Sequence, residues 1–184
     1  GNIPWDAFDV DVVIDATGQS LTRKELELHL EAGAKRVFTT KNPKEIIDRY
    51  VIPGINEGTI KPEDKVVSTT SSTTQVLALM VKMLDEKFGL EKAMMTTVHA
   101  YTADQPLADA AGVDLRRSRS AVENIIPNTT KAPSIVEDIM PQFSGKLDGI
   151  AFNVPVPNGS CVDLTTELTN TPSIEEANLS LIHI

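Results

Sequence analysis

The sequence has one cysteine and no apolar run near the roughly 20 residues that a membrane-spanning helix needs. A single cysteine excludes a disulfide framework, and no cysteine or histidine cluster has the spacing of a structural metal site. No basic segment followed by an apolar one opens the chain, as a secretory leader would require. From these absences we expect a soluble, cytoplasmic protein without a metal site.

Positive charge is also scarce. The sequence has 17 lysines and arginines against 26 aspartates and glutamates, which gives a net charge of −9. Such an acidic chain is a poor partner for nucleic acid or an anionic membrane. If it binds an anionic small molecule, it must do so with a local cluster of donors. The one dense basic segment is Arg116–Arg119, whose alternative interpretation is a solvated loop that makes surface ion pairs.

The first part of the chain alternates short apolar runs with one clear helix. Val10–Gly18 is β-branched and apolar and predicts a buried parallel strand with its turn. Thr22 and Glu25 have the spacing of a capping box for a helix that runs to about Ala32. Further strands are predicted at 35–40, 50–56 and 64–70. This rhythm is typical of a Rossmann-type doubly wound α/β sheet, although no G-x-G-x-x-G occurs.

Beyond residue 71 the pattern changes to longer strands and irregular connections. An amphipathic helix is predicted from Ser72 to the stop at Gly89, and another over 130–140. Strands are predicted at 94–100, 149–155 and 160–168, with a polar stretch to about Asn124 between them. We therefore predict two domains: residues 1–71, the later part of a dinucleotide-binding domain, and residues 72–184, an α+β domain with a mixed or antiparallel sheet.

Three segments carry residues suited to chemistry on an anion. Ser68–Thr74 lies at a strand-to-helix turn, where backbone N–H groups and hydroxyls can bind an anion or favour a nucleophile. His99 ends an apolar strand, and Asn128–Lys131 precedes a helix. Each has a plainer interpretation, respectively a helix cap, a structural histidine and a helix start. Together with the arginines they fit a site that holds a phosphorylated small molecule beside a nucleophile.

Their order and spacing resemble phosphorylating glyceraldehyde-3-phosphate dehydrogenases. The resemblance runs from about Val10 to Leu168, and it is carried by five segments: 11–18 (DVVIDATG), 96–102 (TTVHAYT), 114–117 (DLRR), 124–127 (NIIP) and 154–158 (VPVPN). It implies oxidation of an aldehyde with NAD or NADP and inorganic phosphate, through a cysteine thioester. It further implies a homotetramer, in which the segment 101–124 packs against a neighbouring subunit.

The resemblance also implies roles for individual residues, but the sequence departs from the family at the position of the nucleophile. Ser72 stands where the family has its cysteine nucleophile, while His99 matches the family's base. The phosphate-site positions that match are Ser71, Thr102, Asp104, Arg117 and Thr130, and the cofactor positions are Thr17 and Gly18.

Two further positions depart from the family. Lys131 replaces a family glycine and is a candidate to bind phosphate, whereas Asn153 replaces a phosphate-binding arginine. Because a serine hydroxyl is a poor nucleophile at its free pKa, we expect turnover to be impaired. The alternative is a catalytically degenerate homologue that binds a metabolite or a protein partner.

Two other expectations concern the ends of the chain and Cys161. The abrupt start and the patternless end at residues 179–184 suggest a piece of a longer protein. Cys161, in the strand predicted at 160–168, is expected to be a buried structural thiol rather than a substitute nucleophile.

Overall fold

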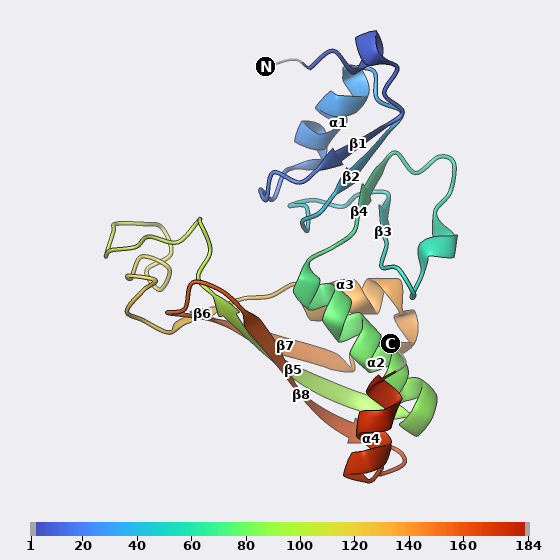
Figure 1. Cartoon of the computed structure of the whole chain (residues 1–184), viewed down its shortest axis with the longest axis vertical. Coiled ribbons are helices and arrows are strands. Elements are labelled where there is room, and N and C mark those ends of the chain that lie inside the picture. Colours follow the sequence, from blue (N-terminus) through green and yellow to red (C-terminus); the bar gives the residue numbers. More distant parts are fainter. Residues whose placement is uncertain (1–2, 183–184) are drawn as a thin grey trace. The chain divides into compact units, whose positions relative to one another are not determined.

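The computed structural model describes residues 3–182 and divides into two compact units, one ending at Ala78 and the other beginning at Leu79 (Figure 1). Helix α2 (Ser72–Phe88) begins in the first unit and ends in the second. The predicted domain boundary at residues 71 and 72 coincides with the start of this helix. Among residues 3–182, no helix is both long and apolar enough to cross a membrane.

The first unit is built on a parallel sheet, as the apolar runs predict. Its strands lie in the order β1 (Val12–Asp15), β2 (Arg36–Thr39), β4 (Val66–Ser68) and β3 (Arg49–Tyr50), and every pair is parallel. Helix α1 (Arg23–Glu31) packs on this sheet and starts with the predicted capping box of Thr22 and Glu25. The core of the unit is formed by Leu26, Val37, Ile47 and Val66. A short 3-10 helix, η1 (Trp5–Phe8), precedes the sheet.

The strand predicted at 50–56 is wrong beyond Tyr50. The chain turns after Ile52, and the 3-10 helix η2 (Glu57–Thr59) follows. The side chain of Asn56 closes this turn: its Oδ1 accepts from the Ile52 N–H at 2.8 Å, and its Nδ2 donates to the Tyr50 carbonyl at 2.9 Å. Pro53 and Gly54 (φ 81°) make the turn possible, because proline cannot donate to a ladder and glycine tolerates positive φ.

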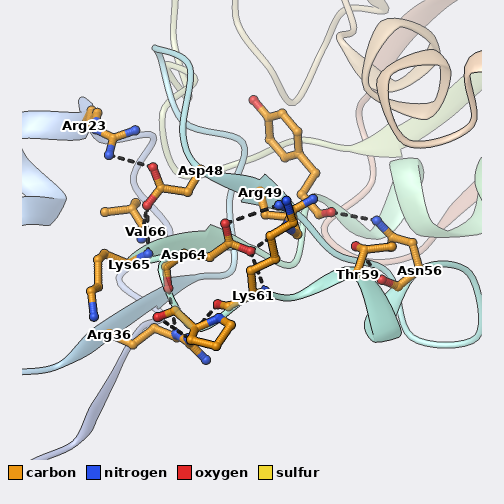
Figure 2. Close-up of polar contacts among 12 residues, drawn as sticks. Arg23, Arg36, Asp48, Arg49, Asn56, Thr59, Lys61, Asp64, Lys65 and Val66 are labelled. Carbon is orange, nitrogen blue, oxygen red and sulfur yellow. Dashed lines mark hydrogen bonds and ion pairs between the residues drawn. The ribbon is translucent and has the colours of Figure 1, made fainter.

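Two buried or half-buried carboxylates hold the loop that leads into β4 (Figure 2). Asp48 accepts from Arg23 at 2.7 Å and from the backbone N–H groups of Lys65 and Val66. Burial alone would raise the pKa of Asp48, but these hydrogen bonds outweigh it and lower the pKa below its ordinary value. Asp64 accepts from Arg49, whose guanidinium likewise lowers the pKa of Asp64.

The second unit contains a mixed sheet, as predicted. Its order is β6 (Ile126–Asn128), β7 (Leu147–Val154), β5 (Leu90–Ala100) and β8 (Ser160–Leu168). The β5 and β7 strands are parallel, whereas β6 and β8 pair antiparallel with their neighbours. Figure 1 shows the irregular segment between β5 and β6 extending beyond the end of this sheet.

Helices complete the second unit. Helix α3 (Ala132–Ile139) packs on β7 through a buried face that includes Ile135 and Val136, and the short η3 (Pro141–Phe143) follows it. Two elements were not predicted from the sequence, namely the three-residue β6 and helix α4 (Ile174–Leu181). Helix α4 carries a capping box of Ser173 and Glu176, the same signal that marks the start of α1, but it buries no residue.

Candidate functional site

The carboxyl edge of the parallel sheet carries the two predicted cofactor residues. Asp15, which is buried at the end of β1, accepts from both the N–H and the hydroxyl of Thr17, at 3.0 and 2.7 Å. Gly18 follows with φ 77°, and no atom lies within 4 Å of the point where a Cβ would stand. An open glycine backbone at this edge fits the close approach of a dinucleotide, which binds at the carboxyl ends of parallel strands.

The hydroxyl-rich turn after β4 is tied to the end of β2. The Thr69 N–H donates to the Thr39 carbonyl at 3.0 Å, and the Ser68 hydroxyl donates to the Lys41 carbonyl at 2.9 Å. Thr70 is buried with φ 64°, a conformation that is rare for a β-branched residue. Gln75 closes the turn from the helix side, because its Nε2 donates to the Thr69 carbonyl at 2.7 Å.

Ser71 and Ser72 have different roles at the start of α2. The hydroxyl oxygen of Ser71 accepts from the Thr74 N–H at 3.2 Å and lies 2.8 Å from the Thr74 hydroxyl, so Ser71 caps the helix. Ser72 is the first residue of the helix and is exposed. Its hydroxyl therefore lies in the positive field of the helix N-terminus, which would stabilise an anionic group there.

In the second unit, His99 lies near the end of β5, beside Asn153 of β7. The Nδ1 of His99 lies 2.8 Å from the Ala100 carbonyl oxygen at the end of β5. Asn153, opposite His99 on β7, is buried and donates through Nδ2 to the same carbonyl at 3.2 Å. Asn128 on β6 donates in turn to Oδ1 of Asn153 at 3.2 Å.

The predicted phosphate residues after β5 form a connected group. The carboxylate of Asp104 accepts from the Thr102 hydroxyl and pairs with Arg117. Burial would raise the pKa of Asp104, but the Thr102 hydrogen bond and the Arg117 charge lower it overall. Asp104 and Arg117 line a cavity of about 730 Å³, together with Gln105 and Ser118. Gln105 was missed by the sequence analysis, yet it is buried and accepts from the Thr102 N–H at 3.0 Å.

Thr130 and Lys131 lie at the start of α3. The Thr130 hydroxyl oxygen accepts from the Ala132 N–H at 3.1 Å, as expected of a residue that caps a helix start. Lys131 is exposed, and within residues 3–182 its ammonium has no hydrogen-bond or ion-pair partner. It is therefore available to an anionic ligand.

The structure thus joins the predicted residues in groups within each unit. Ser71 and Ser72 lie in the first unit with Thr17 and Gly18, whereas the other site residues lie in the second. Because Ser72 and His99 belong to different units, their pairing stays a prediction. The expectation of a buried Cys161 is wrong: the thiol is exposed on β8, where alternate side chains face away from the core.

Comparison with known proteins agrees with the resemblance. The family model for the glyceraldehyde 3-phosphate dehydrogenase C-terminal domain matches residues 71–183. The chain is 45% identical to a glyceraldehyde-3-phosphate dehydrogenase of Streptomyces coelicolor, over 96% of this chain and 53% of that protein. It is 44% identical to the chloroplastic glyceraldehyde-3-phosphate dehydrogenase A of Zea mays, over 96% of this chain and 44% of that protein. The chain therefore spans about half the length of the curated relatives it matches.

Proposed function

The chain belongs to the glyceraldehyde-3-phosphate dehydrogenase family, and from this premise we propose that it binds a phosphorylated aldehyde beside Ser72 but is impaired in phosphorylating turnover. In the family reaction an oxidised nicotinamide of NAD or NADP, when bound, supplies the hydride acceptor. In this chain Thr17 and Gly18 would hold part of that cofactor. The first unit alone contains no G-x-G-x-x-G, so cofactor binding needs the rest of the protein.

The proposal of impaired turnover rests on Ser72, the first residue of α2. A cysteine at this helix N-terminus would ionise readily, because the helix field stabilises a thiolate. The Ser72 hydroxyl stays protonated at neutral pH, so it needs a base such as His99 to remove its proton before it can attack. An ester formed at Ser72 would also be less reactive toward phosphate than a thioester.

The phosphate group of the substrate would lie among Thr102, Arg117, Thr130 and Lys131. Arg117 is already paired with Asp104, which holds its guanidinium in one orientation but shares its charge. Asn153, where the family has an arginine, uses its amide in the contacts with Ala100 and Asn128. The unpaired Lys131 is thus the residue that would restore positive charge to the site.

The decisive test of this function is Ser72→Cys in the full-length protein. We expect the natural protein to produce little NADH from glyceraldehyde 3-phosphate, NAD and phosphate. Ser72→Cys should raise the rate by about 10³-fold or more, since removing a nucleophile can cost up to ~10⁶ in kcat. Ser72→Ala is the control and should match the natural protein. A natural protein as fast as Ser72→Cys would refute the impairment.

A purely binding homologue is the second candidate, favoured by the engagement of Asn153 in contacts within the unit. It predicts that Ser72→Cys stays inactive while the substrate still binds. Calorimetric titration with glyceraldehyde 3-phosphate separates this outcome from a protein that has lost binding as well. Lys131→Gly should weaken that binding, and an unchanged affinity would exclude Lys131 from the site.

For the full-length protein we also propose a homotetramer in the cytoplasm. The proposal is supported by the segment between β5 and β6, which exposes large apolar side chains: Leu107, Val113, Leu115 and Ile125. Several exposed large apolar residues on one segment are typical of a surface that another chain covers. Light scattering after size-exclusion chromatography should give four copies, and Leu115→Asp should reduce that number.

A further inference from the structure

Two asparagine side chains and one histidine side chain are linked through the Ala100 carbonyl. Asn128 donates to Asn153, and both Asn153 and His99 lie at hydrogen-bond distance from the Ala100 carbonyl oxygen. We propose that Asn153, supported by Asn128, is a positioning residue that holds His99 in the tautomer with a proton on Nδ1 and a free lone pair on Nε2. This role rests on the proposed function only in so far as His99 acts as the base. The tautomer itself is independent of turnover.

A backbone donor sets the direction of these hydrogen bonds at the Asn128 end. The Thr129 N–H can only donate, and it donates to Oδ1 of Asn128 at 2.9 Å. This contact places the NH₂ group of Asn128 toward Asn153, where it lies 3.2 Å from Oδ1. The amide of Asn153 must therefore present its own NH₂ group on the other side.

The other end is set by a backbone acceptor. The Ala100 carbonyl can only accept, and it lies 3.2 Å from Nδ2 of Asn153 and 2.8 Å from Nδ1 of His99. A nitrogen at hydrogen-bond distance from this oxygen must carry a hydrogen. His99 Nδ1 is thus protonated, and in the neutral imidazole the lone pair is on Nε2.

The position of the Ala100 carbonyl explains why Asn153 matters. Ala100 is the last residue of β5 and is buried, so its carbonyl lies where the ladder ends. Asn153 itself is only 8% exposed, which shields its two hydrogen bonds from competing water. A side chain that fixes this oxygen fixes the acceptor on which the tautomer of His99 depends.

Nitrogen-15 NMR of the histidine rings tests the proposal directly. The sequence has three histidines, so three ring systems are observed, and His99→Gln assigns the resonances of His99. At a pH where the ring is neutral, we expect His99 to show a protonated Nδ1 and an unprotonated Nε2. The ratio of this tautomer to the other should be at least about 5:1, as a net hydrogen bond provides. Protonation on Nε2 in the natural protein would overturn the proposal.

Asn153→Leu removes both hydrogen bonds at similar side-chain size. We expect the single tautomer to be replaced by a mixture, with at least a threefold drop in the ratio. Asn158→Leu is the matched control, because Asn158 is exposed and its Oδ1 accepts from the N–H of the next residue, Gly159, at 2.8 Å. It should leave His99 unchanged.

An unchanged ratio in Asn153→Leu would refute the role of Asn153. If that variant does not fold, Asn128→Ala gives the test, since it frees the Asn153 amide to rotate and should lower the ratio in the same direction. An unchanged ratio in Asn128→Ala would then refute the proposal. Failure of Ser72→Cys to turn over would refute the proposed activity and leave this tautomer result as it stands.

Discussion

Asp64 gives the sharpest test of how burial decides the strength of an ion pair. Its side chain is 6% exposed, and Arg49 Nε lies 2.5 Å from its Oδ2. An almost fully exposed pair of the same length is present in the same unit, where Lys35 Nζ lies 2.5 Å from Asp11 Oδ1, with side chains 77% and 66% exposed. The two pairs therefore differ in environment and not in distance.

The cost of Asp64→Ala follows from the contacts that it removes. Asp64 accepts from Arg49 Nε and from the Lys61 N–H at 2.8 Å, and a third contact, from Arg49 Nη2, is longer at 3.3 Å. Two strong hydrogen bonds to a charged group contribute about 1.5–3 kcal/mol each. Because the Arg49 side chain is 25% exposed and can regain water, we expect the unit to lose about 3 kcal/mol of unfolding free energy.

Urea unfolding followed by tryptophan fluorescence measures this loss in the first unit. Trp5 is the single tryptophan and lies in that unit, where it donates to Nδ1 of His29 at 3.1 Å. The urea midpoint of Asp64→Ala should fall by about 1–3 M, because the unfolding free energy usually decreases by about 1–3 kcal/mol per M of urea. Asp11→Ala should change it little, because exposed pairs contribute little. Equal shifts in the two variants would refute the reasoning.

The pH dependence of the difference in unfolding free energy between the natural protein and Asp64→Ala is a second check. Arg49, with the Lys61 N–H, lowers the pKa of Asp64 below its ordinary value despite burial. A lowered native pKa stabilises the fold above the pKa of the unfolded carboxyl, about 3.9, and this contribution is lost as the pH falls through the native value. The gap between the natural protein and Asp64→Ala should thus be full at neutral pH and narrow below about pH 4. A gap that is constant down to pH 2 would contradict this origin.

Two further pairs of variants test packing and backbone conformation. Met95→Ala should cost about 2–5 kcal/mol in urea unfolding followed by circular dichroism, since Met95 is fully buried in β5, whereas Met94→Ala on the other face should cost far less. Gly33→Ala should destabilise by about 2 kcal/mol or more, because φ is 111° and the new Cβ would lie 2.6 Å from a backbone nitrogen. Gly145→Ala has open space at φ 74°, so it should cost less than Gly33→Ala, and an equal cost would contradict the steric argument.

Elements with strong local signals could be predicted from the sequence. The capping box of Thr22 and Glu25 fixes the start of α1, and Gly89 with φ 72° ends α2 where its apolar period stops. The parallel sheet followed from its β-branched runs. Elements that depend on distant partners could not be predicted: β6 is three residues long and contains Pro127, and it forms because β7 pairs with it at the sheet edge, where a proline is tolerated.

The same limit applies to the candidate site. Residues within one turn of chain, such as Ser71 with Thr74 or Thr102 with Asp104, could be grouped by spacing. The engagement of Asn153 could not, because its partners Asn128 and Ala100 are 25 and 53 positions away. The sequence shows Asn153 only as a residue that replaces the family's phosphate-binding arginine. In the structure Asn153 is buried, its amide oxygen accepts from Asn128, and its amide nitrogen donates to the Ala100 carbonyl.

This difference predicts that restoring the family's arginine will not simply restore the family's activity. In a Ser72→Cys background, Asn153→Arg should lower the KM for phosphorylated substrate, because a guanidinium provides a charged fork for phosphate. It should also lower kcat, because a guanidinium cannot accept from Asn128 as Oδ1 of Asn153 does, so the contact that orients the donor to the Ala100 carbonyl is lost. Steady-state kinetics separate the two effects. If Asn153→Arg improves both KM and kcat, then Asn153 is only a lost phosphate ligand, and the contacts of its amide have no part in positioning His99.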